Sequence, residues 1–133
     1  MTSVVADTHA FIWYILEPER LSQPALEALD RASSQGDAIF LSAISIVEIC
    51  YLIDKGRLAE TVLDRVITAI ESENAGAEII SINQEVSLAV RQIPRETVPD
   101  MPDRIIAATA LHLKIPLVTK DAKIQSANIQ TIW

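Results

Sequence analysis

Residues 103–121, DRIIAATALHLKIPLVTKD, constrain the fold more than any other stretch of the chain. Asp103 opens about three helical turns of Ile, Ala and Leu, and a short apolar strand at 117–119 leads to a second acid, Asp121. In a parallel α/β unit the helix runs back against the strand, so the helix start and the strand end share one edge of the sheet. The helix that begins at Asp103 and the strand that leads to Asp121 are both on the order of 15 Å long at the usual rise per residue. We therefore expect Asp103 and Asp121 to lie close together.

Short apolar strands alternate with helical patterns along the rest of the chain. We expect strands at 3–6, 38–42, 77–82, 117–119 and 128–133, and helices at 9–16, 22–34, 45–55, 58–73, 83–93 and 103–113. Ser22 and Asn83 are the predicted N-caps, Gly56 the predicted C′ residue, and 94–102, with three prolines, a loop. The pattern predicts an α/β fold in a single domain, 1–133, with a mostly parallel sheet covered on both faces.

Composition narrows the setting in which the protein works. No secretory signal or transmembrane segment is visible, and the single cysteine, Cys50, excludes an internal disulfide and is expected on the apolar side of its helix. We expect a soluble cytoplasmic protein with no membrane association. The net charge of −7 repels polyanions, so contact with nucleic acid requires metal ions or a local basic patch. The best candidates for that patch are Arg104, Lys114, Lys120 and Lys123.

Four acids from separate parts of the chain are expected at the same edge of the sheet. Asp7 follows the first strand, and Glu48 falls in the first turn of the helix after the second strand, so both join Asp103 and Asp121 at the carboxyl edge. Each acid also has a purely structural interpretation. Glu48 fits a capping box with Ser45, Asp103 fits the preference for acids at helix N-termini, and Asp7 and Asp121 could begin turns.

Gathering four acids has an electrostatic cost that a cation would remove. Like charges 4–6 Å apart repel by about 3–4 kcal/mol per pair at an effective dielectric near 20. A hard divalent cation relieves this repulsion, and an all-oxygen ligand set suits Mg²⁺ or Mn²⁺. His9, His112 and Cys50 offer too few ligands for zinc. Such an ion lowers the pKa of a bound water and neutralises phosphate charge, which is the chemistry of phosphodiester hydrolysis.

Motifs across nearly the whole chain resemble the PIN-domain family, and specifically VapC-like toxins of bacterial toxin–antitoxin pairs. The resemblance rests on Asp7-Thr8-His9 with Trp13, Glu48 within Ser-Ile-Val-Glu-Ile, Lys55-Gly56-Arg57-Leu58, Asp100-Met101-Pro102-Asp103-Arg104, and Leu117-Val118-Thr119-Lys120-Asp121.

The resemblance implies a PIN-like α/β/α fold with a five-stranded sheet and a Mg²⁺- or Mn²⁺-dependent endoribonuclease. By motif position Asp7 and Asp103 would be the firmest metal ligands, and Glu48 and Asp121 would complete the cluster by holding a second ion or orienting the attacking water. Supporting residues would be Thr8, Ser45, Asp100, Arg104 and Thr119. The family also implies a homodimer and a small antitoxin that places a basic segment in the acidic site.

Other interpretations stay open at this point. The fold could serve as a non-catalytic protein-binding module, or as a phosphoryl-handling receiver-like or phosphatase-like domain. Arg104 could bind the scissile phosphate or pair with a neighbouring acid. Trp13 and Tyr14 could stack on RNA bases, or pack a helix into the core or a dimer interface, and packing is favoured about three to one.

Overall fold

The computed structural model describes residues 2–34, 36–72 and 76–133. Within these residues one five-stranded sheet has the order β3-β2-β1-β4-β5, and every neighbouring pair is parallel. The strands are β1 Val4–Ala6, β2 Ile39–Ser42, β3 Ala77–Ile80, β4 Leu117–Val118 and β5 Thr131–Ile132. The chain therefore builds outward from β1 through β2 to β3, then returns to the other side of β1 for β4 and β5. The order reverses between β1 and β4.

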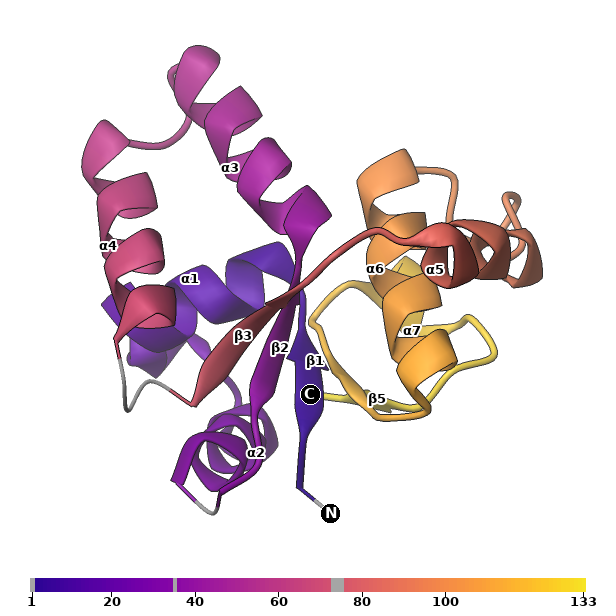
Figure 1. Cartoon of the computed structure of the whole chain (residues 1–133), viewed down its shortest axis with the longest axis horizontal. Coiled ribbons are helices and arrows are strands. Elements are labelled where there is room, and N and C mark those ends of the chain that lie inside the picture. The colour runs from indigo at the N-terminus through magenta and orange to yellow at the C-terminus, as the bar shows by residue number, and fades with distance from the viewer. Residues whose placement is uncertain (1, 35, 73–75) are drawn as a thin grey trace.

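Helices cover both faces of the sheet. They are α1 Thr8–Leu16, α2 Gln23–Ser34, α3 Ala43–Asp54, α4 Glu60–Glu71, α5 Gln84–Ala89, α6 Met101–Leu113 and α7 Ala122–Gln125, with 3-10 turns η1 Pro18–Arg20 and η2 Val90–Gln92. Figure 1 shows α1 to α4 on one side of the sheet and α5 to α7 on the other. The fold is thus the expected three-layer α/β/α arrangement with a parallel sheet.

Alternation along the central strands creates a separate core on each face. Val4 and Ala6 pack into the cluster under α1 to α4, whereas Val5 packs into the cluster under α5 to α7. In β4, Val118 belongs to the first cluster and Leu117 to the second. Successive strand residues point to opposite faces, so a strand covered on both sides must be apolar throughout. β1 and β4 are apolar throughout, and this made both strands predictable from the sequence.

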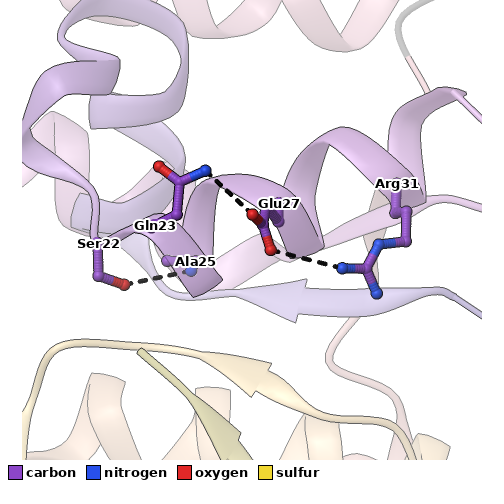
Figure 2. Close-up of polar contacts among 5 residues, drawn as sticks. All are labelled: Ser22, Gln23, Ala25, Glu27 and Arg31. Atoms are coloured by element: carbon purple, nitrogen blue, oxygen red, sulfur yellow. Dashed lines mark hydrogen bonds and ion pairs between the residues drawn. The ribbon is translucent and has the colours of Figure 1, made fainter.

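Local capping explains where most helices begin. Ser22 Oγ accepts from the Ala25 amide at the start of α2, and Figure 2 shows the Gln23–Glu27 hydrogen bond and the Glu27–Arg31 ion pair that continue along the same helix. Asn83 Oδ1 accepts from Val86 N at 2.9 Å, which confirms it as the cap of α5. Gly56 has φ 72° just beyond the C-cap of α3, which confirms the predicted C′ glycine.

The start of α3 differs from the sequence-based expectation. The helix begins at Ala43 instead of Ser45, and its N-cap is Ser42, whose hydroxyl accepts from the Ile44 amide at 3.2 Å. The capping-box interpretation of Ser45 and Glu48 is therefore wrong, and Glu48 lies in the second turn of α3. Ser42 and Ser45 are both buried, but the Ser42 hydroxyl bonds the backbone of its own helix whereas the Ser45 hydroxyl contacts Thr8 of α1.

The start of α6 also differs, because the expected loop 94–102 ends earlier. The helix begins at Met101 with Asp100 as N-cap, and Pro102 lies in its first turn. Proline is tolerated there because the first amides of a helix have no partner within the helix.

Smaller differences concern short or terminal pieces. The turns of η1 and α7 were not expected, and β3, β4 and β5 are shorter than predicted. The last residue of the expected helix 58–73 lies outside the described residues. Cys50 is exposed, so its predicted core position is wrong. Among the described helices, none is long and apolar enough to cross a membrane.

Candidate active site

A cleft lies at the carboxyl ends of β1 and β4, where the strand order reverses. Ligands of open parallel sheets bind at this kind of reversal because the connections leave in opposite directions and open a crevice. The cleft has a volume of about 340 Å³. Its lining residues are Asp7, Thr8, His9, Trp13, Glu48, Asp103, Lys120 and Asp121. The structure therefore brings all four predicted acids into one cleft.

Asp7 and Asp121 each follow a central strand and each cap the helix that comes next. Asp7 Oδ1 accepts from the Ala10 amide at 2.8 Å, and Asp121 Oδ1 accepts from the Lys123 and Ile124 amides at 2.8 and 3.1 Å. These two acids therefore have a structural role, as helix N-caps instead of the expected turn residues, and this role does not exclude a second one. A carboxylate has about four lone-pair sites, so capping leaves acceptor capacity facing the cleft.

Thr119 links the two strand-end acids. Its buried hydroxyl donates to Asp7 Oδ2 and accepts from the Asp121 amide at 3.1 Å. Burial raises the pKa of Asp7 above its usual 3.8, and the bonds from Thr119 and Ala10 partly offset this increase. One threonine on β4's carboxyl end therefore fixes the carboxylate that follows β1.

Glu48 is held by the buried hydroxyl of Thr8, which in turn contacts the buried hydroxyl of Ser45. Thr8 Oγ1 donates to Glu48 Oε1 at 2.5 Å, and the hydroxyl oxygens of Thr8 and Ser45 lie 2.8 Å apart. Both hydroxyl residues are buried. Ser45 is one turn before Glu48 on α3, and Thr8 opens α1, so this contact ties the two helices together at the edge of the cleft. Thr8 and Thr119 each donate to an acid, and Ser45 contacts the Thr8 hydroxyl.

Asp103 lies in the first turn of α6, behind its cap. Asp100 Oδ2 accepts from the Asp103 amide at 3.2 Å. Burial, together with the negative charges of Asp100, Asp121, Glu48 and Asp7, raises the pKa of Asp103 from 3.8 to about 7. The raised pKa thus reflects burial first and, after it, the repulsion among acids expected from the sequence. A proton or a cation in the cleft would relieve it.

The donor set suits a hard divalent cation in its chemistry, since it consists of carboxylate oxygens. In residues 2–34, 36–72 and 76–133, however, no group of three or more His, Cys, Asp or Glu side chains could hold a metal ion as they stand. The negative charges that raise the pKa of Asp103 repel one another, which favours side-chain conformations that keep the carboxylates apart. Ligation would thus require side-chain rotation within the cleft, which its open volume allows.

Arg104 is the predicted site residue that the structure places elsewhere. Its guanidinium donates to the carbonyl oxygens of Val90 and Ile93 at 2.9–3.2 Å, and the residue does not line the cleft. Successive helix residues are rotated by about 100°, so a neighbour of Asp103 in sequence faces a different direction. Arg104 closes the C-terminal end of η2 and neither contacts an acid nor faces the site.

The cleft also contains Trp13 and Lys120, which the predicted acid site did not include. Trp13 packs against the first core cluster, as favoured, and lines the cleft as well. Tyr14 instead donates to Asp30 at 2.8 Å. Lys120 lines the cleft between Thr119 and Asp121, and that position in the motif was the available signal.

A sequence comparison identifies the family. The model of the PIN domain matches residues 4–129, which is nearly the whole chain. The chain belongs to the PIN-domain family. It is 30% identical over 126 residues to Ribonuclease VapC22 of Mycobacterium tuberculosis, and the match covers 95% of this chain and 92% of that protein.

Solved structures share the same PIN fold. A chain in the crystal structure of VapBC2 from Rickettsia felis bound to a DNA fragment from its promoter superposes with a TM-score of 0.72 at 16% identity, covering 97% of this chain and 96% of that one. A chain in the structure of VapBC-1 from nontypeable Haemophilus influenzae gives a TM-score of 0.66 at 18% identity, with coverage of 97% and 96%. At such identities the likeness concerns the fold.

Proposed function

We propose that this PIN-domain protein is a divalent-metal-dependent endoribonuclease that hydrolyses RNA phosphodiester bonds in the four-acid cleft. The observation that carries the proposal is the convergence of Asp7, Glu48, Asp103 and Asp121, from four separate segments, on one cleft at the strand-order reversal. The relative named as a ribonuclease, which aligns over nearly the whole length of both proteins, supports the same activity. We treat residues 1–133 as a single PIN-like domain.

We assign Asp7 and Asp103 as the firmest ligands of Mg²⁺ or Mn²⁺. The Asp7 carboxylate accepts hydrogen bonds from the Ala10 amide and from Thr119, so its position is fixed. The negative charge of Asp103 is opposed by burial and by neighbouring acids, and a cation would stabilise it. Glu48 and Asp121 complete the cluster by holding a second ion or orienting the attacking water. A divalent cation bound there would supply a water of lowered pKa and positive charge opposite the phosphate and the leaving oxygen.

The remaining polar residues of the cleft keep the acids in place. Thr8 and Thr119 direct their hydroxyls at Glu48 and Asp7, and each is buried, so neither side chain is free to rotate toward solvent. Mutation of residues that orient metal ligands in this way commonly changes metal affinity or activity by 10–100-fold.

A protein partner is the second part of the proposal. We propose a small antitoxin whose basic segment enters the acidic cleft, as the VapBC neighbours and the net charge of −7 suggest. An apolar groove of about 400 Å³ adjoins the cleft and shares Glu48 with it. Its exposed Val47 and Tyr51 offer apolar contacts, and Asp100 adds negative charge at the same place.

We further propose that the protein is a homodimer and that it works in the cytoplasm. Light scattering tests the homodimer, because the monomer mass is 14.6 kDa.

RNA cleavage by the purified protein tests the enzyme proposal. Cleavage should require Mg²⁺ or Mn²⁺, stop in EDTA, and resume when excess metal is restored. Asp64→Asn, which removes an exposed acid of α4 outside the cleft, should leave cleavage unchanged. Cleavage that persists in EDTA would contradict the proposal. Tight Mn²⁺ binding without cleavage of any RNA would instead favour the non-catalytic binding module.

A further inference from the structure

Part of the cleft lining is aromatic and basic instead of acidic. The Trp13 ring is the centre of this aromatic–basic patch, which consists of His9, Trp13, Arg20 and Lys120. The Arg20 guanidinium carbon lies 4.4 Å from the Trp13 ring centroid, Lys120 Nζ lies 5.9 Å from it, and the His9 ring lies 5.8 Å away at a tilt of 53°. Three of the four residues line the cleft together with the acids.

The fold fixes both ends of this patch relative to the acids. Trp13 lies on α1, whose start is capped by Asp7, and its ring also packs edge-on against Trp133 at 6.0 Å. Lys120 follows Thr119, whose amide donates to the Ile132 carbonyl at 3.1 Å and whose carbonyl accepts from Gln125 at 3.0 Å. The backbone that carries Lys120 is therefore anchored by the residue that holds Asp7.

The charge on Lys120 is available to a ligand. Among the described residues, no carboxylate oxygen lies within 4.0 Å of Lys120 Nζ, and the residue is exposed. Arg20, by contrast, is already paired with Glu17 at 3.2 Å. Of the residues that line the cleft, Lys120 is the one lysine or arginine. A strongly acidic protein must hold a polyanion through local contacts, and Lys120 provides one next to the acids.

Stacking alone would not explain why this patch faces the cleft. A cation over a tryptophan often serves only to pack a helix against its neighbour. Here Trp13 is only partly buried and lines the cavity, so part of its ring remains accessible. Single-stranded RNA is commonly recognised through unstacked bases that pack on aromatic side chains, while cations follow the phosphates. The combination of an accessible ring and an unpaired ammonium group matches that chemistry.

We propose that Lys120 binds a phosphate beside the scissile bond and that Trp13 packs against the adjoining base, so that the two residues position single-stranded RNA across the four acids. The proposal rests on the proposed ribonuclease activity and names the residues that hold its substrate. Lys120 and Trp13 act here as positioning residues, and the acids remain responsible for the chemistry.

Steady-state cleavage kinetics test the role of Lys120. Lys120→Met should raise KM by about 5–20-fold and lower kcat far less, because the lost contact is made in both the ground and the transition state. The slope of log KM against log salt should fall by about 0.7, the value for one phosphate contact on a single strand. Lys120→Arg should restore most of the affinity. Arg65→Met, which removes an exposed positive charge of α4 outside the cleft, is the control and should leave KM unchanged.

Intrinsic fluorescence tests the role of Trp13 without turnover. Trp133→Phe leaves Trp13 as the only tryptophan. In EDTA, titration with a mixed-sequence single-stranded RNA of about 12 nucleotides, a length within the usual site size, should quench Trp13 emission. Adding Lys120→Met should weaken that titration by the same factor as it raises KM. Trp13 variants lack this fluorophore and are compared by cleavage kinetics, in which Trp13→Leu should raise KM more than Trp13→Phe, which keeps an aromatic ring.

The two proposals fail in distinguishable ways. Metal-dependent cleavage with a KM unaffected by Lys120→Met, or affected equally by Arg65→Met, would overturn the positioning roles and leave the ribonuclease proposal intact. Lys120-dependent quenching without cleavage of any RNA would support the positioning roles and overturn the enzyme proposal. Absence of both quenching and cleavage would overturn both.

Discussion

Replacing Asp103 with asparagine should stabilise the metal-free protein. The side chain keeps its size but loses the charge that burial and four neighbouring acids oppose. A pKa raised from 3.8 to about 7 corresponds to about 4 kcal/mol in a site shielded from water, at 1.36 kcal/mol per unit. Asp103 is only partly buried, and solvent screening reduces the expected gain to about 1–2 kcal/mol. The melting temperature should rise by about 3–8 °C.

The gain should appear only above the pH at which an unfolded aspartate ionises. Because the pKa of Asp103 is raised in the folded state, the folded protein binds more protons than the unfolded chain between about pH 4 and pH 7. Stability of the wild type therefore falls through this window from the contribution of Asp103 and levels off above it. The difference between Asp103→Asn and the wild type should be near zero below pH 4 and largest at pH 8.

Urea unfolding in EDTA from pH 4 to pH 8 measures this difference directly. Asp64→Asn, at an exposed position of α4, should show no comparable pH-dependent gain. At pH 8, Mn²⁺ at about 100 times its dissociation constant should stabilise the wild type by about 2.7 kcal/mol and the Asp103→Asn protein by less. A variant that is no more stable than the wild type at pH 8, or a difference independent of pH, would refute the assignment of repulsion to this site.

Three further substitutions test the supporting structure. Thr119→Val removes the hydroxyl that donates to Asp7, and we expect cleavage to fall by about 10–100-fold in kcat/KM with a stability loss of about 1–3 kcal/mol in urea. Gly76→Ala should cost about 2–3 kcal/mol in thermal unfolding, because φ is 64° and the added Cβ would lie 2.6 Å from Ser33 Cα. Arg104→Met should cost about 1–3 kcal/mol by removing the side-chain donor of the Ile93 carbonyl and one of the two donors to the Val90 carbonyl, while cleavage per folded molecule stays unchanged.

Each of these substitutions has a control that separates its cause. Thr119→Ser keeps the hydroxyl and should retain most of the activity. Gly36→Ala meets nothing within 4 Å and should cost less than Gly76→Ala, since only its φ of 80° is unfavourable. Arg104→Lys should not rescue stability fully, because an ammonium group lacks the planar fork that reaches both carbonyls. Loss of cleavage in a stable Arg104→Met protein would mean that this residue has a direct role in the site.

The sequence predicted the architecture well because a parallel topology leaves few alternatives. Apolar strands that alternate with helices place every strand end on one edge, so Asp7 and Asp121 had to approach each other once β1 and β4 were neighbours. Asp103 followed from the antiparallel run of α6 against β4. Glu48 reached the cleft even though α3 begins two residues earlier than expected, because an acid in the second turn still faces the same edge.

Other features depended on contacts that no local pattern contains. Ser45 resembles a cap in sequence, but its buried contact with Thr8 is made across two helices. Arg104 follows an acid of the site, yet the rotation of α6 turns it toward backbone carbonyls. Four-residue α7 is too short for hydrophobic periodicity to reveal it. Trp13 fits both the core and the cleft interpretations, since it is partly buried against the first core cluster and also lines the cleft.

The most direct test of the four-acid site compares single amide variants under one set of conditions. Asp7→Asn, Asp103→Asn, Glu48→Gln and Asp121→Asn should each remain folded by circular dichroism, and each should lose RNA cleavage and Mn²⁺ affinity, with the largest losses at Asp7 and Asp103. Asp64→Asn should match the wild type in both measurements. Full cleavage with unchanged Mn²⁺ affinity in purified Asp7→Asn or Asp103→Asn would contradict the assignment of the site.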